Sequence, residues 1–148
     1  MINKFDGEYA FLSNFYECPI VGWDGITYPT NEHYFQAQKT LNKIEKRAIA
    51  AAPTPGKSKR MGRNVQLRPD WEVIKDQVML DALRLKFAVP EMREKLLATG
   101  DEELVEGTWW HDKTWGVCYC PECEGRGENR LGKLLMKVRE EIKNNGNV

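Results

Sequence analysis

The chain has 148 residues, which is the size of one ordinary domain, and its 41% hydrophobic and 30% charged residues are globular values. Its 22 basic and 22 acidic residues leave no net charge, so nucleic-acid binding would need a local basic patch rather than an overall field. No apolar run approaches the ~20 residues of a membrane span, and the first residues lack the apolar stretch of a signal peptide. We therefore expect a cytoplasmic protein without membrane contact, in which reducing conditions keep the four cysteines as thiols.

The first third of the chain predicts a β-hairpin followed by two helices. Asp24-Gly25 lies between two apolar runs, and this dipeptide favours a tight turn in which both residues have positive φ. Thr30 and Asn31 are candidate N-caps for the helix that follows. The elements expected here are a hairpin over 18–28, a helix that ends near residue 42, and a helix over 44–52 closed by Pro53 and Pro55.

The remainder predicts three more helices and a second pair of strands. Asp70 precedes a long helix over 71–88 with a broad apolar face, and Asn129 is expected to cap the last helix. Between them we expect a helix over 91–99 closed by Gly100, and short antiparallel strands over 103–108 and 114–119. Because no repeat or linker interrupts the chain, the prediction is one compact domain over residues 1–148, mainly α-helical with a small antiparallel sheet.

The helix predicted near residue 31 carries a concentrated set of acid–base groups, in the sequence NEHYFQAQK. Seven residues advance a helix by ~700°, about 20° short of two full turns, so Glu32 and Lys39 share one face. Gln36 lies between them on that face, within reach of both side chains. We interpret this face as an active site, with a pair of solvated surface charges as the alternative.

Two further clusters supply candidates for ligand binding. Arg60 and Arg63, around Gly62, offer charged forks and backbone amides to a phosphate, with an ordinary solvated surface as the alternative. Three tryptophans at 109, 110 and 115 surround Asp112, and an indole face stacks on a base for ~1–3 kcal/mol. The alternative places two of the three tryptophans in the core.

Nine motifs in order along the chain resemble one family, the YbiA-like or NADAR N-glycosidases. They are FLSNF at 11–15, EHYFQAQK at 32–39, MGR at 61–63, DW at 70–71, LKF at 85–87, ATG at 98–100, LVE at 104–106, DKTWG at 112–116 and NRLG at 129–132. The resemblance implies a mainly α-helical fold of the YbiA type and hydrolysis of the bond between a ribose anomeric carbon and a nitrogen. It also implies two substrate classes, namely ADP-ribose linked to guanine and the early ribosylaminopyrimidine phosphates of riboflavin synthesis.

Cleavage of an N-glycosidic bond builds positive charge on the ribose carbon and negative charge on the departing nitrogen. We favour Lys39 as a covalent nucleophile that opens the sugar to an iminium, with Glu32 as the proton shuttle. This route needs a lowered lysine pKa, which burial or a second cation would provide. The alternative is direct attack by water, with Asp112 or Glu106 as the base.

Substrate-binding candidates come from several segments. His33 stands beside Glu32 and would orient it, with a structural histidine as the alternative. Of the three tryptophans, the resemblance singles out Trp115 for ligand contact, because the family motif Asp-x-x-Trp-Gly matches at 112–116. The full set of candidates is Ser13, Asn14, His33, Gln36, Arg60, Gly62, Arg63, Trp115, Gly116 and Asn129.

A cysteine-rich loop departs from the simplest pattern of the family. Cys118, Cys120 and Cys123 lie within six residues, and the half CPECEGRG resembles one unit of the DnaJ zinc ribbon, in which two units make a four-thiolate site. Cys18 or His111 would have to complete a tetrahedron here. We expect either a structural zinc or free thiols that pack a glycine-rich turn, and no cofactor for catalysis.

The resemblance implies two functions, and a third from another class is weighed beside them. The leading one is an N-glycoside hydrolase that removes ADP-ribose from guanine in nucleic acid or in a nucleotide. The second is the same chemistry on ribosylaminopyrimidine phosphates of riboflavin synthesis. The third is a non-catalytic module that binds ADP-ribose or a nucleotide. No protein partner is inferred from the sequence.

Overall fold

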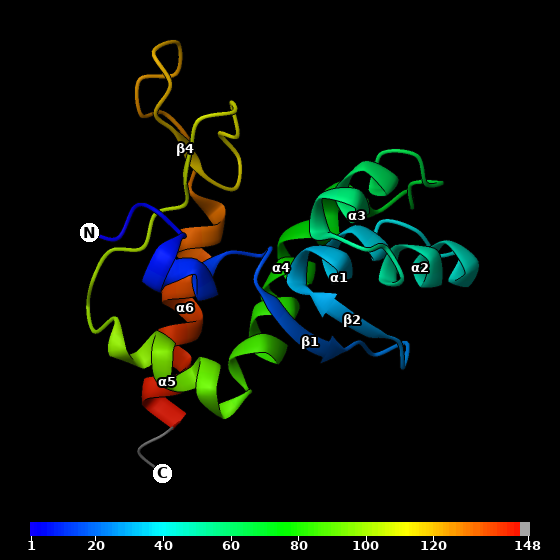
Figure 1. The fold of residues 1–148 in the computed structure, drawn as a ribbon, viewed down its shortest axis with the longest axis horizontal. Helices are drawn as coiled ribbons and strands as arrows, with labels where there is room; N and C mark the ends of the chain where they lie inside the picture. Colours follow the sequence, from blue (N-terminus) through cyan, green and yellow to red (C-terminus); the bar gives the residue numbers. More distant parts are fainter. Residues whose placement is uncertain (146–148) are drawn as a thin grey trace. The chain divides into compact units, whose positions relative to one another are not determined.

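The computed structural model describes residues 1–145, and its contacts divide the chain into two compact units (Figure 1). The central unit is Asn14–Lys86, and the terminal unit combines Met1–Ser13 with Phe87–Val148. Helices dominate, with two small two-stranded sheets, so the predicted mainly α-helical fold is confirmed. The single domain that we expected over 1–148 stays a prediction. No helix within residues 1–145 has the length and apolar character needed to cross a membrane.

The central unit is built on a hairpin and four helices. Strands β1 (Glu17–Val21) and β2 (Thr27–Thr30) pair antiparallel, which confirms the predicted hairpin. Helix α1 (Asn31–Ala37) begins directly after β2 and packs against the hairpin and two further helices. The other helices are α2 (Lys43–Ala50), α3 (Pro55–Gly62) and α4 (Trp71–Phe87).

The hairpin turn differs from the expected two-residue type. Gly25 has φ 79°, but the described non-glycine residues with positive φ do not include Asp24. The loop is longer than expected, because the Gly25 amide donates to the Gly22 carbonyl at 3.0 Å and the Gly22 amide to the Ile26 carbonyl at 3.0 Å. The Asp24 carboxylate accepts hydrogen bonds from the Ile26 amide at 2.9 Å and the Tyr28 hydroxyl at 2.6 Å. Asp24 therefore stabilises the hairpin through its side chain rather than through its backbone conformation.

Helix α1 ends at Ala37, not near residue 42 as predicted. The chain tightens after it, since the Lys39 amide donates to the Gln36 carbonyl at 3.2 Å, three residues back. The Asn42 side chain accepts from the amides of residues 44 and 45, so it caps α2 and cannot extend α1. Lys39 consequently lies in the turn after α1 rather than on it.

Helix α3 was not predicted, because the segment 56–67 shows more basic residues and glycine than apolar periodicity. Pro55, expected only to close the preceding helix, is the first residue of α3. The Thr54 hydroxyl accepts from the Lys57 amide at 3.0 Å and caps the helix. The predicted end of the preceding helix at residue 52 is close to the observed end of α2 at Ala50.

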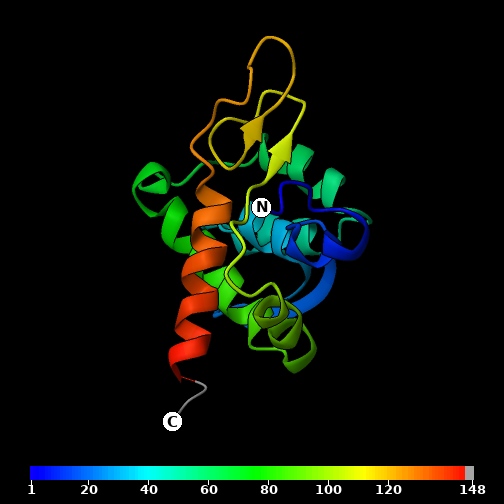
Figure 2. The same ribbon diagram turned by 90° about the vertical axis from the view of Figure 1, so that its left-hand side faces the viewer.

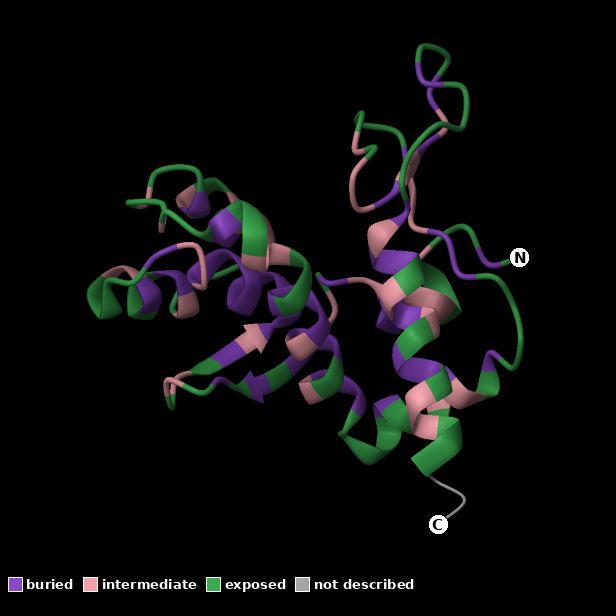
Figure 3. Ribbon diagram, turned by 180° about the vertical axis from the view of Figure 1, so that it is seen from behind, coloured by how far each residue is buried: buried purple, intermediate pink, exposed green. Residues whose placement is uncertain are grey.

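The terminal unit contains a short 3-10 helix, η1 (Gly7–Leu12), and the helices α5 (Pro90–Ala98) and α6 (Arg130–Asn145). α5 packs against both η1 and α6. Buried and exposed positions alternate along α6 with helical spacing, as expected from its apolar face (Figure 3). Gly100 has φ 62°, and its amide donates to the Leu97 carbonyl at 3.0 Å, which closes α5 as predicted.

The second pair of strands is parallel, which corrects the expected antiparallel pairing. β3 (Gly107–Thr108) and β4 (Val117–Cys118) are each two residues long and point the same way (Figure 2). The connecting chain does not make a tight turn at 111–113. Instead it loops back to the start of β3, so that Gly107 lies opposite Val117. A parallel pair needs such a longer connection.

Asn129 directly precedes α6, but its side chain does not cap this helix as predicted. Its Oδ1 accepts from the Glu106 amide at 3.0 Å, and its Nδ2 donates to the Leu104 carbonyl at 3.0 Å. Gly132 leaves room for this clamp, because a Cβ there would lie 2.1 Å from the Leu104 carbonyl oxygen. The Asn129 amide therefore fixes the segment before β3 against the start of α6.

Lys86 is a fully buried lysine near the end of α4, with 0% of its surface exposed. Its ammonium lies 5.6 Å from the centre of the Tyr16 ring. Burial lowers its pKa from 10.5 to about 7. Between about pH 7 and pH 10.5, Lys86 is therefore protonated in the unfolded chain and neutral in the folded chain.

We predict that Lys86→Met removes a pH dependence of stability. Between pH 7 and about 10 the unfolded lysine binds more protons than the folded one, so the wild-type free energy of unfolding rises with pH in this window. The rise is on the order of a few kcal/mol, at about 1.4 kcal/mol per unit of pKa. Urea unfolding at about pH 6 and about pH 9 measures it, and the variant should show a smaller difference.

The control is Lys75→Met, which removes a lysine paired with exposed Glu72 and should keep the wild-type pH dependence. Equal pH dependence in wild type and Lys86→Met would contradict the prediction.

Candidate active site

Helix α1 is buried along its whole length, although four of its seven residues are polar: Asn31, Glu32, His33 and Gln36. It packs against the hairpin on one side and against α2 and α3 on others. Burying a polar group without a partner is costly, so neighbouring elements have to supply hydrogen bonds. A buried helix with this many polar side chains is typical of a ligand-binding or active site, since core packing alone needs only apolar side chains.

Glu32 lies in the first turn of α1 and is 7% exposed. Gln36 Nε2 donates to Glu32 Oε1 at 2.9 Å, one turn along the helix, as the spacing predicted. The Glu32 amide donates to the carbonyl of Asn14 at 3.0 Å. Gln36 fits because Gly62 of α3 faces it without a side chain, since a Cβ at 62 would lie 2.0 Å from Gln36 Oε1.

Lys39 is half-buried, and burial lowers the pKa of its amine. Glu32 opposes this shift by stabilising the ammonium, whereas Arg63 and Lys59 lower the pKa further. The acid and the amine therefore interact electrostatically, although they do not share one helical face as predicted, because α1 ends at Ala37. The turn after α1 produces this proximity, not two full helical turns.

Five buried side-chain atoms in residues 1–145 lack a hydrogen-bond partner, and all belong to the segment 14–38. They are Asn14 Oδ1, Asn31 Nδ2 and Oδ1, Gln36 Oε1 and Gln38 Nε2. An unpaired buried polar atom costs ~1–3 kcal/mol, so native structures rarely gather several. Asn31 and Gln36 lie on α1, and Asn14 contacts it because its carbonyl accepts from the Glu32 amide, so these three residues offer unpaired polar atoms beside α1. Asn31 and Gln38 were absent from the sequence-based candidates.

His33 is fully buried and holds two elements together. Its Nδ1 lies 2.8 Å from the Thr30 hydroxyl, and its Nε2 lies 3.0 Å from the Ala52 carbonyl oxygen. A carbonyl accepts only, so Nε2 carries the proton and Nδ1 accepts from Thr30. Both ring nitrogens are occupied by the protein, which favours the structural alternative for this histidine.

Helix α3 brings basic side chains toward the end of α1. Lys59 of α3 and Arg63, which directly follows α3, both lower the pKa of Lys39. Arg60 is exposed and is not among the groups that shift the Lys39 pKa. Lys59 was missed as a site residue, because only the helical form of this segment shows that positions 59, 62 and 63 share a side. The positive charges next to Lys39 would favour an anionic group such as a phosphate.

The remaining candidates lie in the terminal unit. Asp112 Oδ1 accepts from the amides of Thr114 at 3.1 Å and Trp115 at 2.9 Å, which folds the loop into an Asx turn. Gly116 is buried, and a Cβ there would lie 2.4 Å from the Glu106 carbonyl oxygen. Asn129 clamps the Glu106 amide, as described above. These residues form one connected set.

Two further observations concern the terminal unit. Trp109 and Trp110 are 59% and 60% exposed, so the alternative that placed two of the three tryptophans in the core is wrong. Ser13 closes η1, since its amide donates to the Ala10 carbonyl at 2.9 Å.

Comparison with known proteins identifies the family. The family model of the NADAR domain matches residues 2–143. The chain is 46% identical over 138 residues to N-glycosidase YbiA of Escherichia coli (strain K12), covering 91% of this chain and 82% of that protein. An NMR structure of E. coli YbiA matches with a TM-score of 0.81 and 42% identity, over 99% of this chain and 87% of that one. The chain therefore belongs to the NADAR family, as its motifs indicated, and its relatives include N-glycosidases.

Another relative is named as a riboflavin biosynthesis protein, not as an N-glycosidase. The chain is 38% identical over 140 residues to riboflavin biosynthesis protein VVA0006 of Vibrio vulnificus (strain YJ016). The match covers 93% of this chain but 36% of that longer protein.

We predict that Gly62→Ala disrupts the Glu32–Gln36 pair. The new methyl group would displace the Gln36 amide, because it would lie 2.0 Å from Gln36 Oε1. The free energy of unfolding should fall by about 1–3 kcal/mol, as for other overpacked buried positions. Chemical denaturation measures this change.

Gly56→Ala, in the same helix, is the matched control, because the nearest atoms to a Cβ at 56 lie 3.9 Å away. Equal stability of the two variants would show that Gly62 does not hold Gln36 in place.

Proposed function

We propose that this protein is an N-glycosidase that hydrolyses the bond between a ribose anomeric carbon and a nitrogen. Lys39 is the nucleophile and Glu32 the proton shuttle. The observation that carries the proposal is the half-buried Lys39 amine, whose pKa is lowered by burial while it interacts with the buried carboxylate of Glu32. A lysine with an ordinary pKa is protonated at neutral pH and cannot attack carbon.

The proposed reaction starts with a neutral Lys39 amine and a protonated Glu32. Lys39 Nζ attacks the anomeric carbon, the carbon–nitrogen bond to the base breaks, and the base leaves with the electron pair and the proton of Glu32. The bond between the anomeric carbon and the ring oxygen then opens. The ring oxygen takes a proton from the lysine nitrogen, and an iminium joins Lys39 to the sugar.

Water completes the proposed cycle. It adds to the iminium carbon and gives one proton to Glu32. Glu32 then protonates the lysine nitrogen and takes the proton of the new hydroxyl as the carbon–nitrogen bond to Lys39 breaks. The sugar leaves as its aldehyde, and both catalytic groups return to their starting states.

We propose ADP-ribose linked to guanine as the substrate. Support comes from the positive charges of Arg63 and Lys59 beside Lys39, which suit the phosphates of ADP-ribose. The unpaired amide atoms of Asn14, Asn31 and Gln36 offer donors and acceptors for hydroxyl groups or base edges. The zero net charge favours nucleotides or single-stranded ends over non-specific binding to duplex nucleic acid.

A second candidate substrate is a ribosylaminopyrimidine phosphate of riboflavin synthesis. The observation that favours it is the similarity to VVA0006 of Vibrio vulnificus, which is named a riboflavin biosynthesis protein. The same amine, acid and cations would serve this smaller phosphate. The chemistry at the anomeric carbon would be unchanged.

Two rivals concern the mechanism and not the substrate. In the first, water attacks directly and Asp112 or Glu106 is the base. Asp112 is disfavoured because one of its oxygens already accepts two backbone hydrogen bonds. In the second rival, the protein binds ADP-ribose without turnover. A lysine with a lowered pKa beside a buried acid is not needed by a pure binding module.

We predict that Lys39→Ala lowers turnover by at least about a thousandfold while substrate still binds, because it removes the nucleophile. Release of ADP-ribose from an ADP-ribosylated guanine oligonucleotide measures turnover, and a ribosylaminopyrimidine phosphate is assayed beside it. Borohydride added during wild-type turnover should attach the sugar to Lys39 by reducing the iminium, and peptide mass spectrometry locates it.

Lys75→Ala, in the same unit, should retain full turnover and serves as the control. Retained turnover in Lys39→Ala, with no trapped sugar on the wild type, would remove lysine from the mechanism. Faster release from the pyrimidine than from the guanine substrate would favour the second candidate substrate. Binding without cleavage of either substrate, even by the wild type, would leave only the binding module.

We predict that Arg63→Ala moves the rising limb of the pH–rate profile to higher pH. Arg63 lowers the pKa of Lys39, so its removal raises that pKa, and the reactive neutral amine forms at a higher pH. The measurement is kcat as a function of pH, at saturating substrate.

Lys57→Ala removes an exposed positive charge from α3 that does not shift the pKa of Lys39, and its profile should match the wild type. If the rising limb of the Arg63→Ala profile stays at the wild-type pH, the limb reports the titration of a group other than Lys39.

A further inference from the structure

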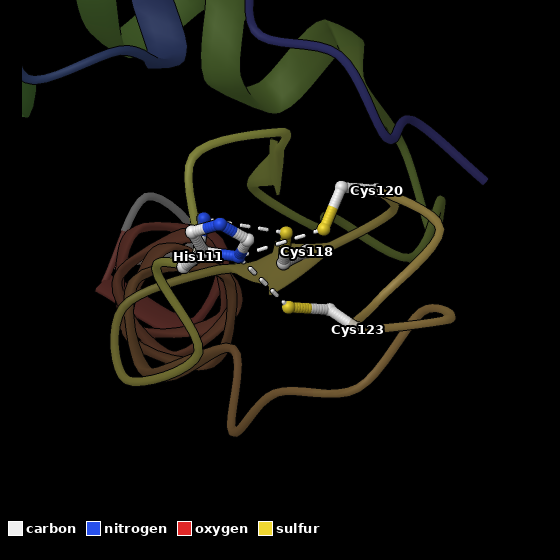
Figure 4. A group of neighbouring side chains, drawn as sticks. All are labelled: His111, Cys118, Cys120 and Cys123. Atoms are coloured by element: carbon white, nitrogen blue, oxygen red, sulfur yellow. Dashed lines mark hydrogen bonds between the residues drawn. The ribbon is translucent and has the colours of Figure 1, made fainter.

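The loop around β4 brings four metal-binding side chains together (Figure 4). They are His111, Cys118, Cys120 and Cys123, and their ligand atoms all lie within 4.8 Å of one another. His111 Nδ1 lies 3.3 Å from Cys123 Sγ and 3.5 Å from Cys120 Sγ. The three thiols are buried, and they form a small buried cluster of their own.

We propose that His111, Cys118, Cys120 and Cys123 bind one structural zinc ion. Three thiolates and one imidazole are a common ligand set of structural zinc sites, and all four positions of the tetrahedron are filled by protein. A closed site of this kind leaves no position for substrate or water. The zinc is therefore structural and takes no part in the N-glycosidase reaction.

The spacing of the ligand atoms fits a tetrahedron around zinc. Zinc–sulfur bonds of about 2.3 Å and zinc–nitrogen bonds of about 2.0–2.1 Å place sulfur about 3.6 Å from nitrogen and about 3.8 Å from another sulfur. The observed separations between His111 Nδ1 and the sulfurs of Cys120 and Cys123 are close to these values. Little movement of the loop would be needed to accept the ion.

The backbone of the loop holds the thiols in this arrangement. The Cys120 carbonyl accepts from the amides of Cys123 at 3.1 Å and Glu124 at 2.9 Å, which makes a tight turn between two of the ligands. The guanidinium of Arg126 donates to the Cys123 carbonyl at 2.9 Å and closes the turn from outside. The His111 amide donates to Cys118 Sγ at 3.3 Å, a bond that favours a thiolate.

His111 completes the set, and Cys18 does not. The sequence left both residues open as the fourth ligand. Cys18 lies in β1 of the central unit and is absent from the group of neighbouring ligand atoms. His111 has φ 68°, a left-handed conformation that is uncommon for a non-glycine residue and that directs its ring to the three sulfurs.

The zinc would replace a hydrophobic core in this part of the chain. The loop has few large buried side chains other than the cysteines, and Trp109 and Trp110 are exposed. Metal binding supplies folding free energy where a short segment cannot bury enough apolar surface. The ion would also fix Asp112 and the Asx turn, because His111 precedes them directly in the chain.

Metal content and cobalt substitution test the proposal. The reduced wild-type protein should carry about one zinc per chain by plasma mass spectrometry. After zinc removal, titration with Co²⁺ should give thiolate-to-cobalt charge-transfer absorption and the intense visible bands of a tetrahedral site, saturating at about one equivalent. Cys120→Ser should lower the bound zinc at least about tenfold, and His111→Ala should weaken zinc binding in competition with a chromophoric chelator.

Cys18→Ser is the matched control, since it removes a buried cysteine outside the cluster and should keep one zinc per chain. If Cys120→Ser does not fold, the cobalt spectrum of the wild type still decides the question. Absence of tetrahedral cobalt bands would overturn the proposal. So would equal loss of zinc in Cys18→Ser and Cys120→Ser, or unchanged zinc in both.

Discussion

The burial of polar side chains on α1 is the constraint on which the rest of the central unit depends. Glu32 stays in the interior because Gln36 binds it, and Gln36 has room because Gly62 carries no side chain. A carboxylate that lost this partner would pay a desolvation cost of several kcal/mol. The hairpin before α1 and the helices after it are therefore arranged to enclose one short polar helix, and the candidate site results from that enclosure.

Lys39 owes its chemistry to its position just beyond this helix. Burial and the neighbouring cations of α3 favour the neutral amine, whereas Glu32 favours the ammonium. The balance leaves the pKa of Lys39 below its ordinary value, close to an acid. The NADAR family to which the chain belongs includes N-glycosidases, and the proposed roles of Lys39 and Glu32 rest on these local electrostatics.

The terminal unit uses a different kind of constraint. Its strands are only two residues long and cannot hold the chain by themselves. The Asn129 amide fixes one side of β3, and the cluster of His111 with three cysteines gathers the loop around β4. The loop is thus held by polar clamps and a cysteine cluster, whereas the helices of the same unit bury apolar side chains such as Leu96, Leu131 and Leu135.

The sequence by itself determined the elements with strong local signals: the Asp-Gly hairpin, the apolar faces of α4 and α6, and the ends of α5 at Pro90 and Gly100. It also determined the pairing of Glu32 with Gln36, because one helical turn separates them. Only the tertiary structure decided that α1 ends at Ala37, that the segment after Pro55 is a helix, that β3 and β4 run parallel, and that His111 joins the cysteines. Each of these depends on contacts between residues distant in the sequence or on a loop conformation, and hydrophobic periodicity carries no information about either.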